Sequence, residues 1–185
     1  MEHKQIKKII SCIYAVVFIA VLVFIDQWAK WRALLQLKPR QQPLVAIPHI
    51  LDLTYLENKG AAWGMLQNQQ WLFVIIAAVL MVFAAVYYVH LPIEKKYMPL
   101  RVLIVLLASG AVGNMIDRIT HGFVIDFFEF SFISFPVFNV ADVYVTVSVA
   151  LLAVLILFVY KEEDWMLDFN REKDKTHKKG KEKDE

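Results

Sequence analysis

Long apolar runs separated by short polar connections are the main pattern along the chain. Four of these runs approach the length of a bilayer crossing, roughly 20 residues. They are residues 9–25, 71–89, 100–116 and 143–160, or about 9–29, 71–89, 100–118 and 141–160 when their polar ends are included. The pattern therefore predicts an all-α membrane protein with four transmembrane helices.

The first apolar run follows three lysines, Lys4, Lys7 and Lys8, as the apolar core of a cleavable secretory signal also does. The run continues into Asp26 and Gln27 instead of a cleavage site with small residues. We therefore expect this helix to be retained as a membrane anchor.

A second periodicity occurs in the connection after the first span. Leu51, Leu53 and Tyr55 alternate with polar residues, which is the period of a half-buried strand, and the segment 58–60 has turn chemistry. We expect residues 31–70 to form a loop subdomain that holds a small extracytoplasmic β-sheet on the membrane surface.

Composition supports a membrane protein and leaves little room for a second domain. Of 185 residues, 58% are hydrophobic, 21% are charged, and the mean hydropathy is +0.49. We expect one membrane domain over 1–160 and a charged, disordered tail over 161–185. The net charge of +2, with basic residues at the ends, speaks against nucleic acid as a partner.

Lysine and arginine counts predict the orientation in the membrane. The tail and the connection with Lys95, Lys96 and Arg101 are rich in basic residues, so both should be cytoplasmic, together with the N-terminus. The loops 31–70 and 119–139 then lie outside. Basic residues near the first span weaken the rule there: Lys30, Arg32, Lys38 and Arg40.

Polar residues gather where the spans meet the predicted outer surface. Ionisable groups near membrane depth cost several kcal/mol unless they are paired or solvated, so each is a candidate for function. The set is Asp26, Lys30, Asn114, Asp117, Arg118, Asp126, Glu129, Asn139 and Asp142. Asp26 with Lys30 also fits a simple ion pair at a helix end, and Arg118 with Asp117 also fits an interfacial anchor.

Asp126 and Asp142 are the most informative pair in this set. Asp126 lies in an apolar segment that favours its protonated form, whereas Asp142 opens a membrane helix whose dipole favours the anion. Two such carboxyl groups brought together would share a proton and could activate water. Asp142 also fits a helix cap and Asp126 a loop carboxylate, and Asp117 and Glu129 remain alternative partners.

Other chemistries lack their residues. The histidines are scattered, no HExxH or GxSxG motif occurs, and Cys12 is the one cysteine, so we expect neither a metal nor a cofactor. Gly110 and Gly113 are expected to let helices approach closely.

Five blocks of sequence resemble one known family. The chain resembles bacterial lipoprotein signal peptidase (signal peptidase II), a four-span aspartic protease of the cytoplasmic membrane, over about 26–160. The blocks are DQWAK at 26–30, YLENKGAAWG at 55–64, GAVGNMIDR at 110–118, VIDF at 124–127 and FPVFNVAD at 135–142.

The resemblance implies a function and a site. Asp126 and Asp142 would be the catalytic pair. The residues implied to line or support the site are Asn58, Gly64, Asn114, Arg118, Asn139, Asp26 and Lys30. The family's substrate is a diacylglyceryl-modified prolipoprotein, which is cut just before the lipidated cysteine, and its inhibitor is globomycin. Membrane lipid would be the other partner, and we expect a monomer.

Two features depart from the family pattern. Ser148 stands where many members carry glycine, and the charged tail is longer than usual. Neither touches the expected aspartate pair.

A non-enzymatic carrier or proton relay is the alternative from another class. It would place Asp126, Asp142 and Arg118 along a polar pathway through the membrane. Such a pathway needs ionisable residues throughout the membrane depth, whereas the middles of the spans are almost free of charge.

Overall fold

The computed structural model describes residues 2–40, 42–60 and 65–160. Gly64 and the tail at 161–185, for which the sequence predicts a loop role and disorder, lie outside this part. Four long helices dominate the described part: α1 (Glu2–Gln36), α2 (Gln70–His90), α3 (Met98–His121) and α4 (Val140–Val154). A short 3-10 turn, η2 (Lys95–Tyr97), precedes α3, and a π-helical turn, η3 (Leu155–Val159), continues α4.

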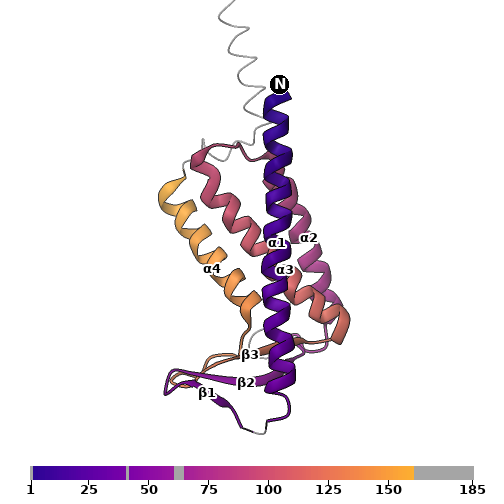
Figure 1. Cartoon of the computed structure of the whole chain (residues 1–185), viewed down its shortest axis with the longest axis vertical. Helices are drawn as coiled ribbons and strands as arrows, with labels where there is room; N and C mark the ends of the chain where they lie inside the picture. The colour runs from indigo at the N-terminus through magenta and orange to yellow at the C-terminus, as the bar shows by residue number, and fades with distance from the viewer. Residues whose placement is uncertain (1, 41, 61–64, 161–185) are drawn as a thin grey trace, which may run out of the picture.

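All four helices are long and apolar enough to cross a membrane, which confirms the predicted architecture. The spans so defined are Gln5–Gln36, Gln70–His90, Lys95–His121 and Val140–Val159. α1 has 35 residues and is therefore about 52 Å long, well over the roughly 30 Å of a hydrocarbon core. Its N-terminal end reaches past the other helices in Figure 1.

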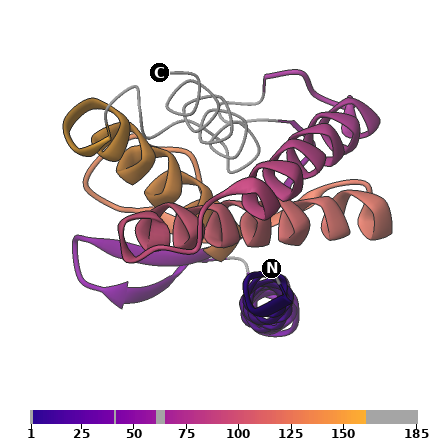
Figure 2. The same cartoon turned by 90° about the horizontal axis from the view of Figure 1, so that it is seen from above.

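α3 is the central helix of the bundle and packs against α1, α2 and α4 (Figure 2). Two glycines of α3 allow this helix to pack closely against α4 and α1. A Cβ at Gly110 would lie 2.5 Å from the Ala141 oxygen of α4, and one at Gly113 would lie 2.5 Å from Oδ2 of Asp26 of α1. The expected role of both glycines in close helix packing is therefore confirmed.

A three-stranded antiparallel sheet lies across one end of the bundle (Figure 1), and we call this the sheet end. Its strands are β1 (Leu44–Ile47), β2 (Leu51–Asn58) and β3 (Val124–Phe130), in the order β1-β2-β3. The sequence pattern predicted a sheet in the first loop but missed β3, which comes from the connection between α3 and α4. In the β2–β3 register, Leu56 is opposite Asp126.

α1 is attached to the sheet by a small apolar core. Ala33 and Leu37, near the end of α1, pack with Ile125 and Phe127 of β3. All four side chains are buried. This contact fixes the height of β3 relative to α1, and so the level at which Asp126 lies.

At the opposite end of the bundle, Arg101 of α3 joins three helices. Its guanidinium donates to the Leu91 oxygen at the end of α2 (2.6 Å) and to Ser11 Oγ of α1 (3.0 Å). It also lies over the Tyr88 ring of α2, 4.5 Å from the ring centroid. A cation at the C-terminus of α2 is placed favourably relative to the helix dipole.

Candidate active site

A cavity of about 580 Å³ opens at the sheet end, between the sheet and helices α2, α3 and α4. Its polar lining brings together residues from four different elements. These side chains are Asn58, Asn114, Arg118, Asp126, Asp142 and Thr146. Asp126 of β3 and Asp142 of α4 therefore face the same space.

Asp126 is held on β3 by two amide side chains. Its Oδ2 accepts a hydrogen bond from Asn58 Nδ2 (2.9 Å), and its Oδ1 accepts one from Asn139 Nδ2 (2.6 Å). The residue is only 1% exposed. Burial, followed by the negative charge of Asp142, raises the pKa of Asp126 from 3.8 to about 7. This agrees with the protonated form that its apolar sequence context favours.

Asp142 lies in the first turn of α4 and takes part in a capping box. Asn139 is the N-cap: its Oδ1 accepts from the backbone N–H of Asp142 (3.0 Å), and Oδ2 of Asp142 accepts from the backbone N–H of Asn139 (3.1 Å). Asn114 Nδ2 donates to the other oxygen, Oδ1 (2.8 Å). Asp142 is therefore not the N-cap, as the alternative interpretation had it, but the N3 partner in the capping box, and it also lines the cavity.

Asn139 and Asn114 connect the two aspartates. Asn139 binds Asp126 through its side chain and Asp142 through its backbone, and its Nδ2 also donates to Asn114 Oδ1 (3.1 Å). The carboxyl groups are therefore held relative to one another through a pair of amides from α3 and the start of α4.

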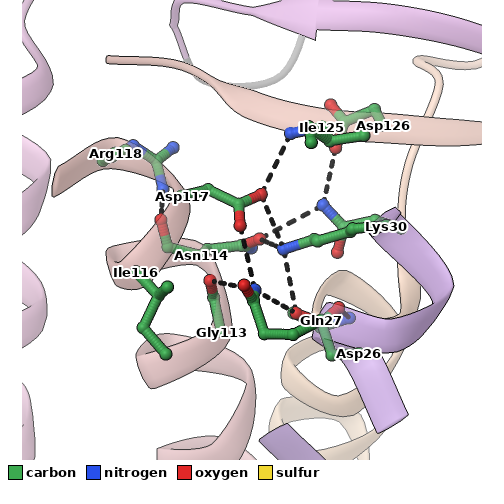
Figure 3. Close-up of polar contacts among 12 residues, drawn as sticks. Asp26, Gln27, Lys30, Gly113, Asn114, Ile116, Asp117, Arg118, Ile125 and Asp126 are labelled. Atoms are coloured by element: carbon green, nitrogen blue, oxygen red, sulfur yellow. Dashed lines mark hydrogen bonds and ion pairs between the residues drawn. The ribbon is translucent and has the colours of Figure 1, made fainter. Parts of the chain in front are cut away.

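Lys30 lies beside Asn114 and is 1% exposed (Figure 3). Its Nζ is 3.0 Å from Oδ2 of Asp26, 3.0 Å from Oδ2 of Asp117 and 2.9 Å from Oδ1 of Asn114. An ammonium group has three protons, so each can have its own acceptor. The predicted Asp26–Lys30 pair is present, but it is part of a larger buried network.

Asp117 and Gln27 complete the network, and the sequence reasoning did not assign either a supporting role. Asp117 accepts from the backbone N–H of Ile125, the residue before Asp126 (3.0 Å), and from Gln27 Nε2 (2.9 Å). Asp26 Oδ1 accepts from the backbone N–H of Ala141 in the first turn of α4 (2.9 Å). The two carboxylates flanking Lys30 thus hold the segments that carry Asp126 and Asp142.

Neither alternative partner faces the cavity as a member of the pair. Asp117 is 1% exposed and is bound to Lys30, and Glu129 lines a separate surface depression beside Asp52. Only Asp126 and Asp142 among the candidate carboxylates line the cavity in the described part of the chain.

Arg118 lines the cavity on the α2 side. Its guanidinium lies over the Phe73 ring of α2 (4.7 Å to the centroid) and donates to the backbone oxygens of Asn114 (3.2 Å) and Gly60 (3.4 Å). Its Nε–H has no hydrogen-bond partner among the described residues. Arg118 therefore belongs to the cavity and is not simply an interfacial anchor.

The rest of the cavity is apolar. Phe130, Phe135 and Phe138 form an aromatic wall in which rings lie 5.1 to 6.0 Å apart. Val143 and Val147 of α4 and Phe73 of α2 also line the cavity. No group of three or more potential metal ligands occurs among the described residues.

A bundle of four membrane helices with two aspartates facing an apolar cavity at one end defines a multi-pass membrane protein with a candidate hydrolytic site. The family model described as signal peptidase (SPase) II matches residues 18–158. The chain belongs to this family of peptidases.

Individual relatives agree with the family match. The chain is 43% identical over 148 residues to a lipoprotein signal peptidase of Streptococcus thermophilus (strain CNRZ 1066), covering 80% of this chain and 93% of that protein. It is 41% identical over 143 residues to one of Clostridioides difficile (strain 630), covering 77% and 94%.

Two solved structures of bacterial membrane enzymes are similar in fold. One, at 2.3 Å resolution, has a TM-score of 0.70 at 30% identity and covers 80% of this chain and 92% of its own. The other, at 1.9 Å resolution, has a TM-score of 0.68 at 32% identity, with 80% and 94% covered.

Proposed function

We propose that this protein is an aspartic endopeptidase that removes the signal peptide from diacylglyceryl-modified prolipoproteins, cutting before the lipidated cysteine. The observation that carries the proposal is that Asp126 and Asp142 face one cavity and are joined through Asn139. Family membership and the lipoprotein signal peptidases among the relatives support the substrate class.

In the proposed mechanism the two aspartates share one proton. Asp126, with a pKa of about 7, holds that proton in slightly acidic solution and donates a hydrogen bond to the scissile carbonyl oxygen. Asp142, as the carboxylate, takes a proton from a water molecule, whose oxygen attacks the carbonyl carbon. As the water attacks, Asp126 transfers its proton to the carbonyl oxygen, which gives a tetrahedral gem-diol. In the collapse, Asp142 gives the proton it took from water to the leaving amine, and Asp126 takes a proton back from a gem-diol hydroxyl.

The depth of the site suits a lipid-anchored substrate. The diacylglyceryl chains of the substrate remain in one leaflet while its signal helix spans the bilayer, so the scissile bond lies near a membrane surface. The cavity lies at the sheet end of the bundle, and we propose that this end is the outer face of the cytoplasmic membrane, with both termini inside. Asn58, Asn114, Asn139 and Arg118 would contact or orient the reacting groups, and Asp26 and Lys30 would support them.

Separate Asp126→Asn and Asp142→Asn substitutions test the proposal. Each should lower the rate of cleavage of a purified diacylated prolipoprotein in liposomes by about 10²- to 10⁴-fold, because an amide cannot take part in the proton transfers. Asp52→Asn is a matched control, since Asp52 lies on β2 and does not line this cavity. Full cleavage by either cavity variant would contradict the proposal.

A further inference from the structure

Thr146 lines the cavity at a position that the reaction described above does not use. It lies one helical turn after Asp142 on α4, so the two side chains share a face of that helix. At 1.5 Å per residue, Thr146 is about 6 Å further from the start of α4 than Asp142. It is a polar group where Val143 and Val147 make the α4 wall apolar.

The hydroxyl of Thr146 differs from the other serine and threonine hydroxyls of the membrane helices. The residues of this kind are Ser11, Ser109, Thr120, Thr146 and Ser148. Ser109, Thr120 and Ser148 each donate to a backbone oxygen one turn earlier in their own helix, at 2.6 to 2.8 Å. Ser11 is bonded to Tyr88 and Arg101.

Thr146 has no hydrogen-bond partner in the described part of the chain, and its side chain is exposed toward the cavity. A hydroxyl without a partner in an apolar environment costs free energy, and a helical threonine can usually avoid that cost by bonding to its own helix. The orientation of Thr146 leaves the hydroxyl available to a molecule in the cavity.

We infer that the Thr146 hydroxyl donates a hydrogen bond to a backbone carbonyl of the signal peptide, upstream of the scissile bond. This inference rests on the proposed function. A peptide segment that reaches a protease site must leave the helical conformation, so carbonyls near the cut lose their intrahelical partners. In an apolar wall each such carbonyl needs a donor from the enzyme.

The position of Thr146 favours the peptide over the lipid as the partner. The signal peptide precedes the scissile bond and continues along the bundle into the membrane, which is the direction in which Thr146 lies from Asp142. The diacylglyceryl group is attached to the residue after the scissile bond, and its ester carbonyls belong to the interfacial level. Thr146 thus contacts the part of the substrate that is released.

The test compares Thr146→Val, Thr146→Ser and wild type on a diacylglyceryl prolipoprotein in nanodiscs. Thr146→Val, which keeps the shape but removes the donor, should raise KM about tenfold with kcat little changed, because a binding contact is lost. Thr146→Ser should restore most of the affinity. Thr120→Val is the matched control, since its hydroxyl is bonded within α3 (2.8 Å), and it should behave as wild type.

A second substrate carries ether-linked in place of ester-linked chains and therefore has no lipid ester carbonyl. It distinguishes a peptide carbonyl from a lipid carbonyl as the acceptor of the Thr146 hydrogen bond. The penalty of Thr146→Val should be the same on both substrates. A penalty that disappears with the ether lipid, a Thr146→Val enzyme equal to wild type, or a failure of Thr146→Ser to restore affinity would each overturn the inference. Wild-type enzyme inactive on both substrates would instead contradict the proposed function itself.

Discussion

Lys30 determines which way a neighbouring amide points. An ammonium group can only donate, so the group of Asn114 that faces it at 2.9 Å is the amide oxygen. The Asn114 nitrogen is thereby directed at Asp142 (2.8 Å). Asp26 and Asp117 in turn hold Lys30 in place, so a buried ion network orients a neutral side chain that contacts the proposed catalytic pair.

The sequence predicted the carboxylates of the site better than the groups that hold them. Asp126 and Asp142 could be singled out because acidic residues near membrane depth are costly. Gln27 gave no such signal, since a glutamine at a helix end is unremarkable in sequence. Asp117 lies beside Arg118 in the chain, which suggested a local anchor, whereas its actual partners come from α1 and β3.

The raised pKa of Asp126 predicts an alkaline limit to activity. A carboxyl group with a pKa of about 7 keeps its proton at pH 6 and loses it at pH 8, so the general acid is lost as the pH rises. Above about pH 7, kcat/KM should fall about tenfold per pH unit. A pH profile of prolipoprotein cleavage measures this, with Asp52→Asn expected to follow wild type. Constant activity from pH 6 to pH 9 would contradict the assignment.

Substitutions of Asn139 can separate its two roles, which are to cap α4 and to donate a hydrogen bond to Asp126. Serine is also a good N-cap but cannot donate to Asp126 as the Asn139 amide does at 2.6 Å. Asn139→Ser should therefore lose less stability than Asn139→Ala while lowering kcat about 10- to 100-fold, because the buried carboxyl group of Asp126 loses a donor. Asn139→Ala should lose both the activity and about 1 kcal/mol of stability.

Thermal unfolding in detergent and cleavage assays on the same preparations distinguish these outcomes. An Asn139→Ser enzyme that is fully active would show that the amide is dispensable. A large loss of stability in that variant would show that serine does not replace the cap.

At the level of elements, helices were easier to predict than the sheet. Each membrane helix is a long, locally encoded apolar run, whereas β3 reads VIDFFEF and lacks regular alternation. Four residues at its start are buried, because β3 packs between β2 and α1, so its pattern does not show one polar and one apolar face. The long-range pairing that makes it a strand is not visible in the local sequence.

The contact between α3 and α4 predicts the effect of a single added methyl group. In Gly110→Ala the new Cβ would lie 2.5 Å from the Ala141 oxygen and 2.7 Å from Val145 Cγ2, so the helices must move apart. We expect a loss of about 1–3 kcal/mol in stability and reduced cleavage, because Asp142 follows Ala141 in the first turn of α4.

Gly122→Ala is the comparison for this variant. Gly122 has a φ of 76° with open space around it, so alanine there should cost about 1–2 kcal/mol through the backbone alone and leave the α3–α4 contact intact. Melting temperatures and cleavage rates of the two variants measure the difference. Gly110→Ala with wild-type stability and activity would show that the contact can relax freely.

For the whole molecule, the distribution of basic residues predicts the direction of insertion. In a Cys12→Ser background, Gln42→Cys lies near the sheet end and Lys95→Cys lies in η2 at the opposite end. A membrane-impermeant maleimide added to intact cells should label Gln42→Cys and not Lys95→Cys. Permeabilised cells, in which both should react, provide the control, and the reverse labelling would invert the proposed topology.

The walls that α2 and α4 contribute to the cavity also determine which substrate concentration sets the rate, the number per unit of membrane area or the number per litre. Phe73 of α2 and Val147 of α4 belong to membrane-spanning helices and line the cavity, so we expect a substrate anchored in the same bilayer to reach the site by diffusing in two dimensions. Diluting reconstituted vesicles with buffer should leave the turnover rate unchanged. Adding lipid to the vesicles should slow turnover, because the number of substrate molecules per unit of membrane area falls while the number per litre stays the same.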